Sequence, residues 1–233
     1  MNTNKEFSLK NDKIIYDITK FTHLDYPEHL AAIIWFSGCN MRCDYCYNKD
    51  IVFAKQGSIT MDEALSFLRS RIALLDGVVL SGGEATAYDL VTFSHEIKKM
   101  GFCIKLDTNG TNFNTIKELL ERKLLDYIAL DYKAPQEKFT QITHSHKYHE
   151  FSKTLDLLLR SNINFEVRTT LHADLLTPQD INLIINDLED RGYKNTYYIQ
   201  EFLETKQNIA NIKKSTIEFD KNLIQSRLNI IWR

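Results

Sequence analysis

Six short runs rich in β-branched and aromatic residues alternate with five segments of helical pattern along most of this 233-residue chain. The runs are LAAIIWF at 30–36, GVVLS at 77–81, FCIKLD at 102–107, YIALD at 127–131, FEVRTT at 165–170 and TYYIQEF at 196–202. Strands that alternate with helices pair in parallel through right-handed crossovers, and apolar runs indicate a sheet covered on both faces. The alternation predicts a single α/β domain, either an open doubly wound sheet or an incomplete barrel.

The ends of the predicted strands carry most of the unusual residues of the chain. Parallel sheets and barrels bind ligands at the carboxyl edge of their strands. In chain order, the residues at these ends are Cys39, Cys43, Cys46, Gly82, Gly83, Glu84, Asp107, Thr108, Asn109, Asp131, Lys133, Arg168 and Gln200. Each alone is compatible with a turn or an ion pair. Their joint placement predicts one functional site at this rim.

Composition and charge exclude several classes of partner. The formal net charge is −2 and the pI is about 6.4, with acidic and basic residues interspersed, so the chain lacks the basic surface of a nucleic-acid-binding protein. The longest apolar run, 30–36, is far too short to cross a membrane, and the first ten residues lack the apolar core of a signal peptide. We expect a cytoplasmic protein with no nucleic-acid or membrane partner.

Three of the four cysteines lie within eight residues, in the stretch CNMRCDYC. In a reducing compartment this spacing indicates metal binding or redox chemistry rather than a structural disulfide. A zinc site needs a fourth ligand, which His23 or His29 could supply, and Cys43 with Cys46 could form a redox dithiol. A [4Fe–4S] cluster is a better use of three thiolates, because it leaves one iron open to an outside ligand.

The spacing C-x3-C-x2-C, with Tyr45 just before the last cysteine, resembles the radical S-adenosylmethionine (SAM) superfamily. VVLSGGEAT resembles the glycine-glycine-glutamate motif of that family, and LDTNG resembles a third-strand motif of the enzymes that activate glycyl radical enzymes. FTHLDYPEHLAAIIWFSGCNMRCDYCYN, IALDYKAP and FEVRTTLH are similar to one subgroup, the anaerobic ribonucleoside-triphosphate reductase activating proteins. The resemblance covers about residues 16–203 and implies one radical SAM domain, an incomplete (β/α)6 barrel of the TIM type with its helices outside, followed by an extension over 204–233.

The resemblance also implies two cofactors and the residues that hold them. Cys39, Cys43 and Cys46 would hold a [4Fe–4S] cluster, whose open iron would bind the amino and carboxylate groups of SAM. Cofactor contacts would come from Tyr45, Gly82, Gly83, Glu84, Asp107, Thr108, Asp131, Lys133, Arg168 and Gln200. Glu84 could instead brace the end of its strand. No residue is expected to act as a general acid or base, because the cofactors carry the chemistry.

Asp107 and Asp131 resemble positions that bind a monovalent cation beside the SAM carboxylate in some activating enzymes. Carboxylates placed close together repel one another unless a cation lies between them. Hard oxygen ligands are also the usual ligands of hard cations. A monovalent cation is therefore a further expected component of the site.

The implied reaction is reductive cleavage of SAM to methionine and a 5′-deoxyadenosyl radical, with electrons from a donor such as flavodoxin or ferredoxin. The radical would remove hydrogen from a glycine near the C terminus of a large glycyl radical enzyme, an anaerobic ribonucleotide reductase. One alternative is a radical SAM enzyme that acts on a small molecule, such as a 7-carboxy-7-deazaguanine synthase-like ring rearrangement. Another is a non-enzymatic zinc or redox module.

Three remaining features have no expected part in the site. Cys103 lies inside an apolar strand and is expected to be a buried core residue. His144, His146 and His149, in THSHKYHE, are expected in a solvated loop or helix start rather than in a metal site. The stretch from residue 206 to the end predicts a helix followed by a final strand, without an assigned role.

Overall fold

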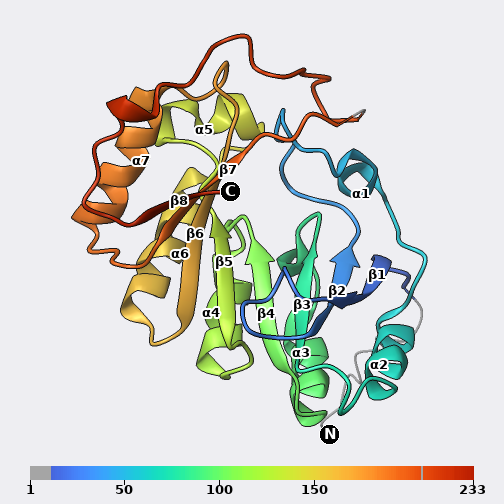
Figure 1. Ribbon diagram of the computed structural model, residues 1–233. Helices are drawn as coiled ribbons and strands as arrows, with labels where there is room; N and C mark the ends of the chain where they lie inside the picture. The colour runs from blue at the N-terminus through green and yellow to red at the C-terminus, as the bar shows by residue number, and fades with distance from the viewer. Residues whose placement is uncertain (1–11, 206) are drawn as a thin grey trace, which may run out of the picture.

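The computed structural model describes residues 12–205 and 207–233, so the first ten residues, on which the signal-peptide prediction depends, lie outside the described part. Within these ranges, eight strands form one sheet in chain order (Figure 1). β1 is antiparallel to β2, and all other neighbouring pairs are parallel. The strands are β1 (Ile15–Thr22), β2 (Ala31–Phe36), β3 (Gly77–Gly82), β4 (Cys103–Thr108), β5 (Tyr127–Asp131), β6 (Asn164–Leu171), β7 (Tyr197–Glu201) and β8 (Ile230–Trp232).

The helices lie on the outer face of the curved sheet (Figure 1). Because the strands follow one another in chain order, right-handed crossovers all turn the same way and place their helices on one face. A doubly wound sheet reverses its strand order, so the barrel alternative is confirmed. The barrel is incomplete, since β1 and β8 do not pair. The helices are α1 (Lys49–Phe53), α2 (Met61–Arg69), α3 (Leu90–Lys99), α4 (Phe113–Glu121), α5 (Gln136–Thr143), α6 (Tyr148–Arg160) and α7 (Pro178–Asp190).

Local sequence explains where several of these helices begin and end. α2 and α7 each start with a capping box, formed by Thr60 with Glu63 and by Thr177 with Asp180. The β5–β6 crossover contains two helices, because His144 adopts a left-handed conformation (φ 53°) that ends α5. None of the described helices has the length and apolar character needed to cross a bilayer.

The sheet contains two strands more than the six predicted runs. β1 is an edge strand in which only the first and last residues, Ile15 and Thr22, are buried, so it lacks the apolar run that identified the others. β8 is the predicted final strand, and it extends the sheet beyond β7. The helix predicted before it is wrong: the described residues there contain only the short 3₁₀ segment η2 (Lys221–Leu223). Asp174 instead holds this region by accepting hydrogen bonds from the main-chain nitrogens of Thr216 and Ile217.

The two faces of the sheet have different characters because strand side chains alternate. Outward side chains such as Ile34, Leu80 and Leu106 join the helices in the main hydrophobic core. A smaller apolar cluster that includes Ile33 and Val79 lies apart from it. Other inner positions are polar and lead to the carboxyl ends of the strands: Lys105, Asp107, Asp131, Glu166, Arg168 and Gln200. Cys103 packs against the smaller cluster but is only half-buried, which departs from its predicted place in a buried core.

Candidate active site

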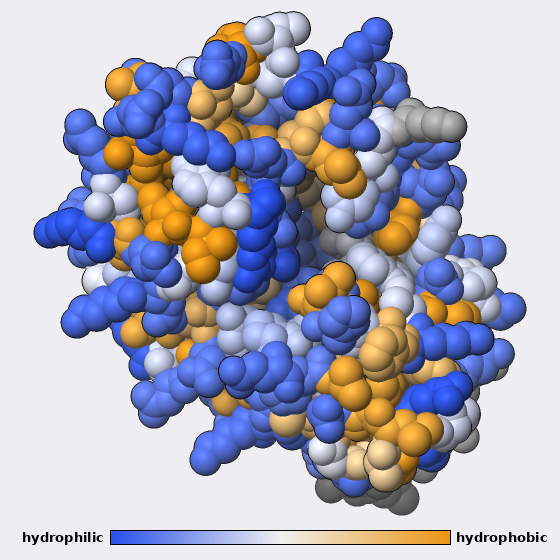
Figure 2. Space-filling model, viewed as in Figure 1, coloured by the Kyte–Doolittle hydropathy of each residue, from blue (hydrophilic) through white to orange (hydrophobic). Residues whose placement is uncertain are grey.

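A cavity of about 420 Å³ opens where the strands end, and Figure 2 shows this face of the molecule hollowed there. Its wall contains every site residue predicted from the sequence: Cys39, Cys43, Tyr45, Cys46, Gly82, Gly83, Glu84, Asp107, Thr108, Asp131, Lys133, Arg168 and Gln200. Trp35, Ser81 and Thr170 also line it and were not predicted. The two-residue period of the strands would have identified them, because they share the inner face with predicted residues.

The loop that carries the three cysteines is fixed by the end of helix α5. The main-chain nitrogens of Arg42 and Asp44 donate to the carbonyls of Thr143, at 2.8 Å, and Ile142, at 3.1 Å. Carbonyls in the last turn of a helix lack partners within the helix, so this contact satisfies both elements. The His144 ring lies 2.7 Å from an Asp44 carboxylate oxygen, which makes this exposed histidine part of the loop support.

The C-terminal extension holds the same loop from its other side. The main-chain nitrogens of Ile209 and Ala210 donate to the carbonyls of Cys46 and Asp44, both at 3.1 Å. In Figure 1 the extension leaves β7, passes over the top of the sheet towards this loop and returns to β8. The sequence predicts no role for the extension, whereas the structure shows that it helps to preform the cysteine loop.

The side chains do not form a site for a single metal ion. Within the described ranges, no three His, Cys, Asp or Glu side chains are grouped closely enough to hold one. The ring of His29 stacks on Tyr26 and its Nδ1 lies 2.7 Å from the Pro27 carbonyl oxygen. This argues against the Cys3His zinc alternative. His144 lies at the end of α5 and His149 in the first turn of α6.

The cysteine thiols differ from those of a redox dithiol. Burial raises the pKa of Cys39 to about 11 and that of Cys43 to about 12, and burial also raises the pKa of Cys46. Redox-active thiols have lowered pKa values. One buried and two half-buried cysteines on a preformed loop that lines a cavity instead fit a metal group that is larger than one ion and that removes the thiol protons.

The two glycines of the Gly-Gly-Glu motif allow backbones to approach one another. A Cβ added at Gly82, where φ is +121°, would lie 2.3 Å from the main-chain nitrogen of Phe36. A Cβ at Gly83 would lie 1.7 Å from the carbonyl oxygen of Gly38. These contacts place the end of β3 against the start of the cysteine loop. The glycines are therefore required by packing within the protein, whatever else approaches them.

Glu84 braces the ends of two strands. Its buried carboxylate accepts hydrogen bonds from the hydroxyls of Thr86 and Thr108, at 2.5 Å and 2.8 Å, and from the main-chain nitrogen of Asn109, at 2.8 Å. Burial raises the pKa of Glu84, and the hydrogen bonds oppose that shift. The structure favours the bracing role for Glu84. The Thr108 hydroxyl donates its hydrogen to Glu84, so it cannot also donate a hydrogen bond to a ligand.

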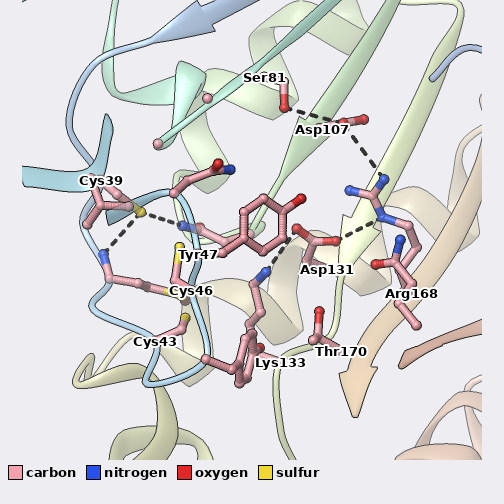
Figure 3. Close-up of a pocket in the computed structure, with 18 of the residues that line it drawn as sticks. Cys39, Cys43, Cys46, Tyr47, Ser81, Asp107, Asp131, Lys133, Arg168 and Thr170 are labelled. Atoms are coloured by element: carbon pink, nitrogen blue, oxygen red, sulfur yellow. Dashed lines mark hydrogen bonds and ion pairs between the residues drawn. The ribbon is translucent and has the colours of Figure 1, made fainter. Parts of the chain in front are cut away.

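A buried network of charges crosses the inner face of β4, β5 and β6 (Figure 3). Asp131 accepts from Arg168 Nε at 2.9 Å and from Lys133 Nζ at 3.0 Å. Asp107 pairs with Lys105 Nζ and lies 3.7 Å from Arg168 Nη1. Burial alone would raise the pKa of Asp131, but Arg168 and Lys133 lower it to about 2. Asp131 is therefore ionised, and cationic side chains lie beside both carboxylates.

This network supplies positive charge at the place where a monovalent cation was expected. The expectation rested on repulsion between Asp107, Asp131 and the carboxylate of SAM. Lys105, which is only 2% exposed, already pairs with Asp107, and two cationic groups hold Asp131. A buried lysine is uncommon unless paired, which fits its place beside a buried carboxylate.

Tyr45 and Gln200 both line the cavity. Tyr45 is 4% exposed, and its hydroxyl is buried with no hydrogen bond among the described residues. The Nζ of Lys133 lies 6.0 Å from the centre of its ring. Gln200 is half-buried on the wall of the cavity. A buried hydroxyl without a partner fits a place where a ligand completes the site.

The sequence around this cavity matches a known protein family. Residues 33–188, more than half of the chain, match the model of the radical SAM superfamily. The chain is a radical SAM protein. The cofactors of this superfamily are a [4Fe–4S] cluster and SAM, and the cavity residues fit that pair. The non-enzymatic zinc or redox module is thereby replaced by an enzyme of the radical SAM kind.

Relatives place this radical SAM protein among the activating enzymes. A putative glycyl-radical enzyme activating enzyme of Methanocaldococcus jannaschii is 31% identical over 81% of this chain and 80% of its own length. The pyruvate formate-lyase 1-activating enzyme of Escherichia coli K12 is 35% identical, but the match spans 54% of this chain and 56% of that relative. The crystal structure of Streptococcus suis SuiB bound to S-adenosylmethionine shares the fold, with a TM-score of 0.66 and 13% identity over 86% of this chain and 51% of that one.

Proposed function

We propose that this radical SAM protein is an activase that generates a glycyl radical on a much larger enzyme, an anaerobic ribonucleoside-triphosphate reductase. The class of partner is supported by the names of the relatives, and the reductase by the stretches of the sequence that resemble its activating proteins. The observation that carries the proposal is that the cysteine loop, the Gly-Gly-Glu motif and the ion-paired carboxylates face one open cavity. The electron would come from a donor such as flavodoxin or ferredoxin.

The residues of the chain bind and orient the cofactors in this proposal. Cys39, Cys43 and Cys46 would hold the cluster, which together with SAM would supply a carbon-centred radical that can remove a hydrogen atom. Arg168 and Lys133 are held by Asp131 and offer cationic N–H groups on the cavity wall to a carboxylate. The chain needs no general base, because hydrogen leaves the substrate as an atom rather than as a proton.

The size and the rim of the cavity favour a protein substrate. About 420 Å³ is in the lower part of the range of roughly 300–1,000 Å³ that small-molecule sites occupy. SAM would therefore leave little room for a second small molecule. The open barrel admits a loop of another protein, and two side chains on the wall, Tyr47 and Leu203, are 56% and 65% exposed. A loop that enters this way brings a glycine Cα close to the reacting group.

The test is anaerobic electron paramagnetic resonance of the reconstituted, reduced chain mixed with SAM and an anaerobic ribonucleotide reductase. We expect the doublet of a glycine-centred radical on the reductase and an equivalent amount of 5′-deoxyadenosine. Radical formation on pyruvate formate-lyase alone would keep the activase and replace its partner. Cleavage of SAM that depends on a purine-like small molecule, with no protein radical, would contradict the proposal.

The lysine paired with Asp107 leads to a prediction about cations. Replacing potassium and sodium by tetramethylammonium will change the SAM affinity of the wild-type protein by less than about twofold, because Lys105 already neutralises Asp107. Lys105→Met will bind SAM at least about tenfold more weakly in tetramethylammonium, and added sodium or potassium will restore part of the loss. Lys105→Arg keeps the charge and is the control. Equilibrium binding of SAM to the reconstituted protein measures all three, and a wild-type requirement for sodium or potassium would contradict the prediction.

A further inference from the structure

Asn109, just after β4, is held by hydrogen bonds from three separate parts of the chain. Its main-chain nitrogen donates to Glu84 at 2.8 Å. Its side-chain oxygen accepts from the main-chain nitrogen of Thr111 at 3.0 Å and from the Thr111 hydroxyl at 2.7 Å. Its Nδ2 donates to the Asn40 side-chain oxygen at 2.8 Å. Asn40 in turn donates to the Thr111 hydroxyl at 2.8 Å, which closes the network.

These bonds fix which way the Asn109 amide faces. A main-chain nitrogen can only donate, so the group that faces Thr111 must be the oxygen of the Asn109 amide. The NH₂ group must then face the cysteine loop. One of its two hydrogens is used by Asn40, and the other points to Cys39, whose sulfur lies 3.9 Å from Nδ2. The network thus leaves one N–H available to one sulfur.

The sulfur of Cys39 receives a second donor from its own loop. The main-chain nitrogen of Met41 lies 3.4 Å from it, and Figure 3 shows both contacts converging on this atom. Asn109 is 5% exposed and Thr111 is 3% exposed, so water does not compete for these groups. A buried polar network with its donors satisfied holds one geometry. The side-chain donor of Asn109 is the one that a substitution can remove without changing the loop.

We propose that Asn109 is a positioning residue that raises the reduction potential of the cluster by donating a hydrogen bond to the sulfur of Cys39. The inference rests on the proposed function, because it requires a cluster bound by Cys39. A hydrogen bond to a cysteine sulfur stabilises the reduced cluster, which carries the additional electron, and so makes the cluster easier to reduce. Glu84 acts through Asn109, since it fixes the main chain from which the amide extends.

The experiment is a redox titration of the full-length, reconstituted protein, followed by electron paramagnetic resonance of the reduced cluster. Asn109→Ala removes the donor. Asn112→Ala is the matched control, because Asn112 follows in the same loop and donates to Thr86 rather than to a sulfur. We expect Asn109→Ala to lower the ratio of reduced to oxidised cluster at a fixed potential about tenfold, equivalent to ~59 mV for one electron, and Asn112→Ala to leave it unchanged.

A second variant keeps the test decisive if Asn109→Ala does not bind a full cluster. Thr111→Val removes the hydroxyl that orients Asn109 but keeps the donor, so we expect a smaller decrease of the same ratio. An Asn109→Ala protein with full iron content and a ratio within twofold of the wild type would overturn the inference. If Asn109→Ala binds no iron, a Thr111→Val protein with the wild-type ratio of reduced to oxidised cluster would also overturn the inference. A wild-type chain that binds no iron would instead overturn the proposed function.

Discussion

Replacing Cys39, Cys43 or Cys46 singly by alanine will lower the iron bound after reconstitution from about four atoms per chain to less than about one. The rate of reductive SAM cleavage will also fall at least about a thousandfold in each variant. The reason is that the loop would supply three ligands, and the fourth cysteine of the chain does not line the cavity. Iron analysis and 5′-deoxyadenosine release under anaerobic reduction measure the two effects.

The fourth cysteine provides the matched control for this prediction. Cys103 is at the start of β4, packs against a small apolar cluster and does not line the cavity. Cys103→Ala should keep the iron content and the SAM cleavage of the wild type. Full iron content in any of the three loop variants, or loss of iron in Cys103→Ala, would show that the cluster is held elsewhere.

Substituting alanine for Gly83 will destabilise the protein by at least ~3 kcal/mol, because overpacking against a fixed backbone cannot be relieved by a change of rotamer. A Cβ there would lie 1.7 Å from the Gly38 carbonyl oxygen, and the next residue, Glu84, donates its main-chain hydrogen bond to that oxygen at 2.9 Å. The end of β3 must therefore move away from the cysteine loop. Urea unfolding at equilibrium measures the change in the free energy of unfolding.

Gly101 is the control for this second prediction. It also has a positive φ, +91°, but a Cβ there would meet no atom within 4 Å. Gly101→Ala should cost only ~1 kcal/mol, the strain of a left-handed alanine. Equal costs for Gly83→Ala and Gly101→Ala would mean that backbone conformation, rather than the contact with Gly38, explains the requirement for glycine.

The position of the site was predictable because two simple rules apply together. Parallel strands bring their carboxyl ends to one edge, and side chains two residues apart on a strand share a face. The first rule collected Asp107, Asp131 and Arg168 although they are far apart in the sequence. The second rule explains why Ser81 and Thr170 also line the cavity.

The features that were missed depend on contacts between distant segments. β1 is an edge strand in which only Ile15 and Thr22 are buried, so its sequence contains no apolar run. The extension is held in extended form by contacts with α7 and with the loop after β6, and these override its local helical pattern. Lys105 and Asp107 lie two residues apart on β4, so the two-residue period of a strand would have predicted their pairing. The ion pair between Asp131 and Arg168 joins two neighbouring strands and became apparent only from the structure.

The hydrogen bonds of Glu84 and Asn109 show that a sequence motif does not by itself define what each of its atoms does. Strand-end placement and resemblance both assign the Gly-Gly-Glu and Asp-Thr-Asn-Gly stretches to the site. Their direct connection, through the Glu84 carboxylate and the Asn109 main chain, requires the register of β3 against β4. Sequence alone predicts that these residues meet, whereas the structure shows which atoms do.

Transfer of deuterium is the measurement that tests the central claim most directly. The partner reductase would be prepared with glycine deuterated at its α carbon, and the 5′-deoxyadenosine formed by the reduced activase and SAM would be analysed by mass spectrometry. The account predicts one deuterium in that product, dependent on Cys39, Cys43 and Cys46. Release of 5′-deoxyadenosine without deuterium, in the presence of the labelled partner, would contradict hydrogen abstraction from a glycine of that protein.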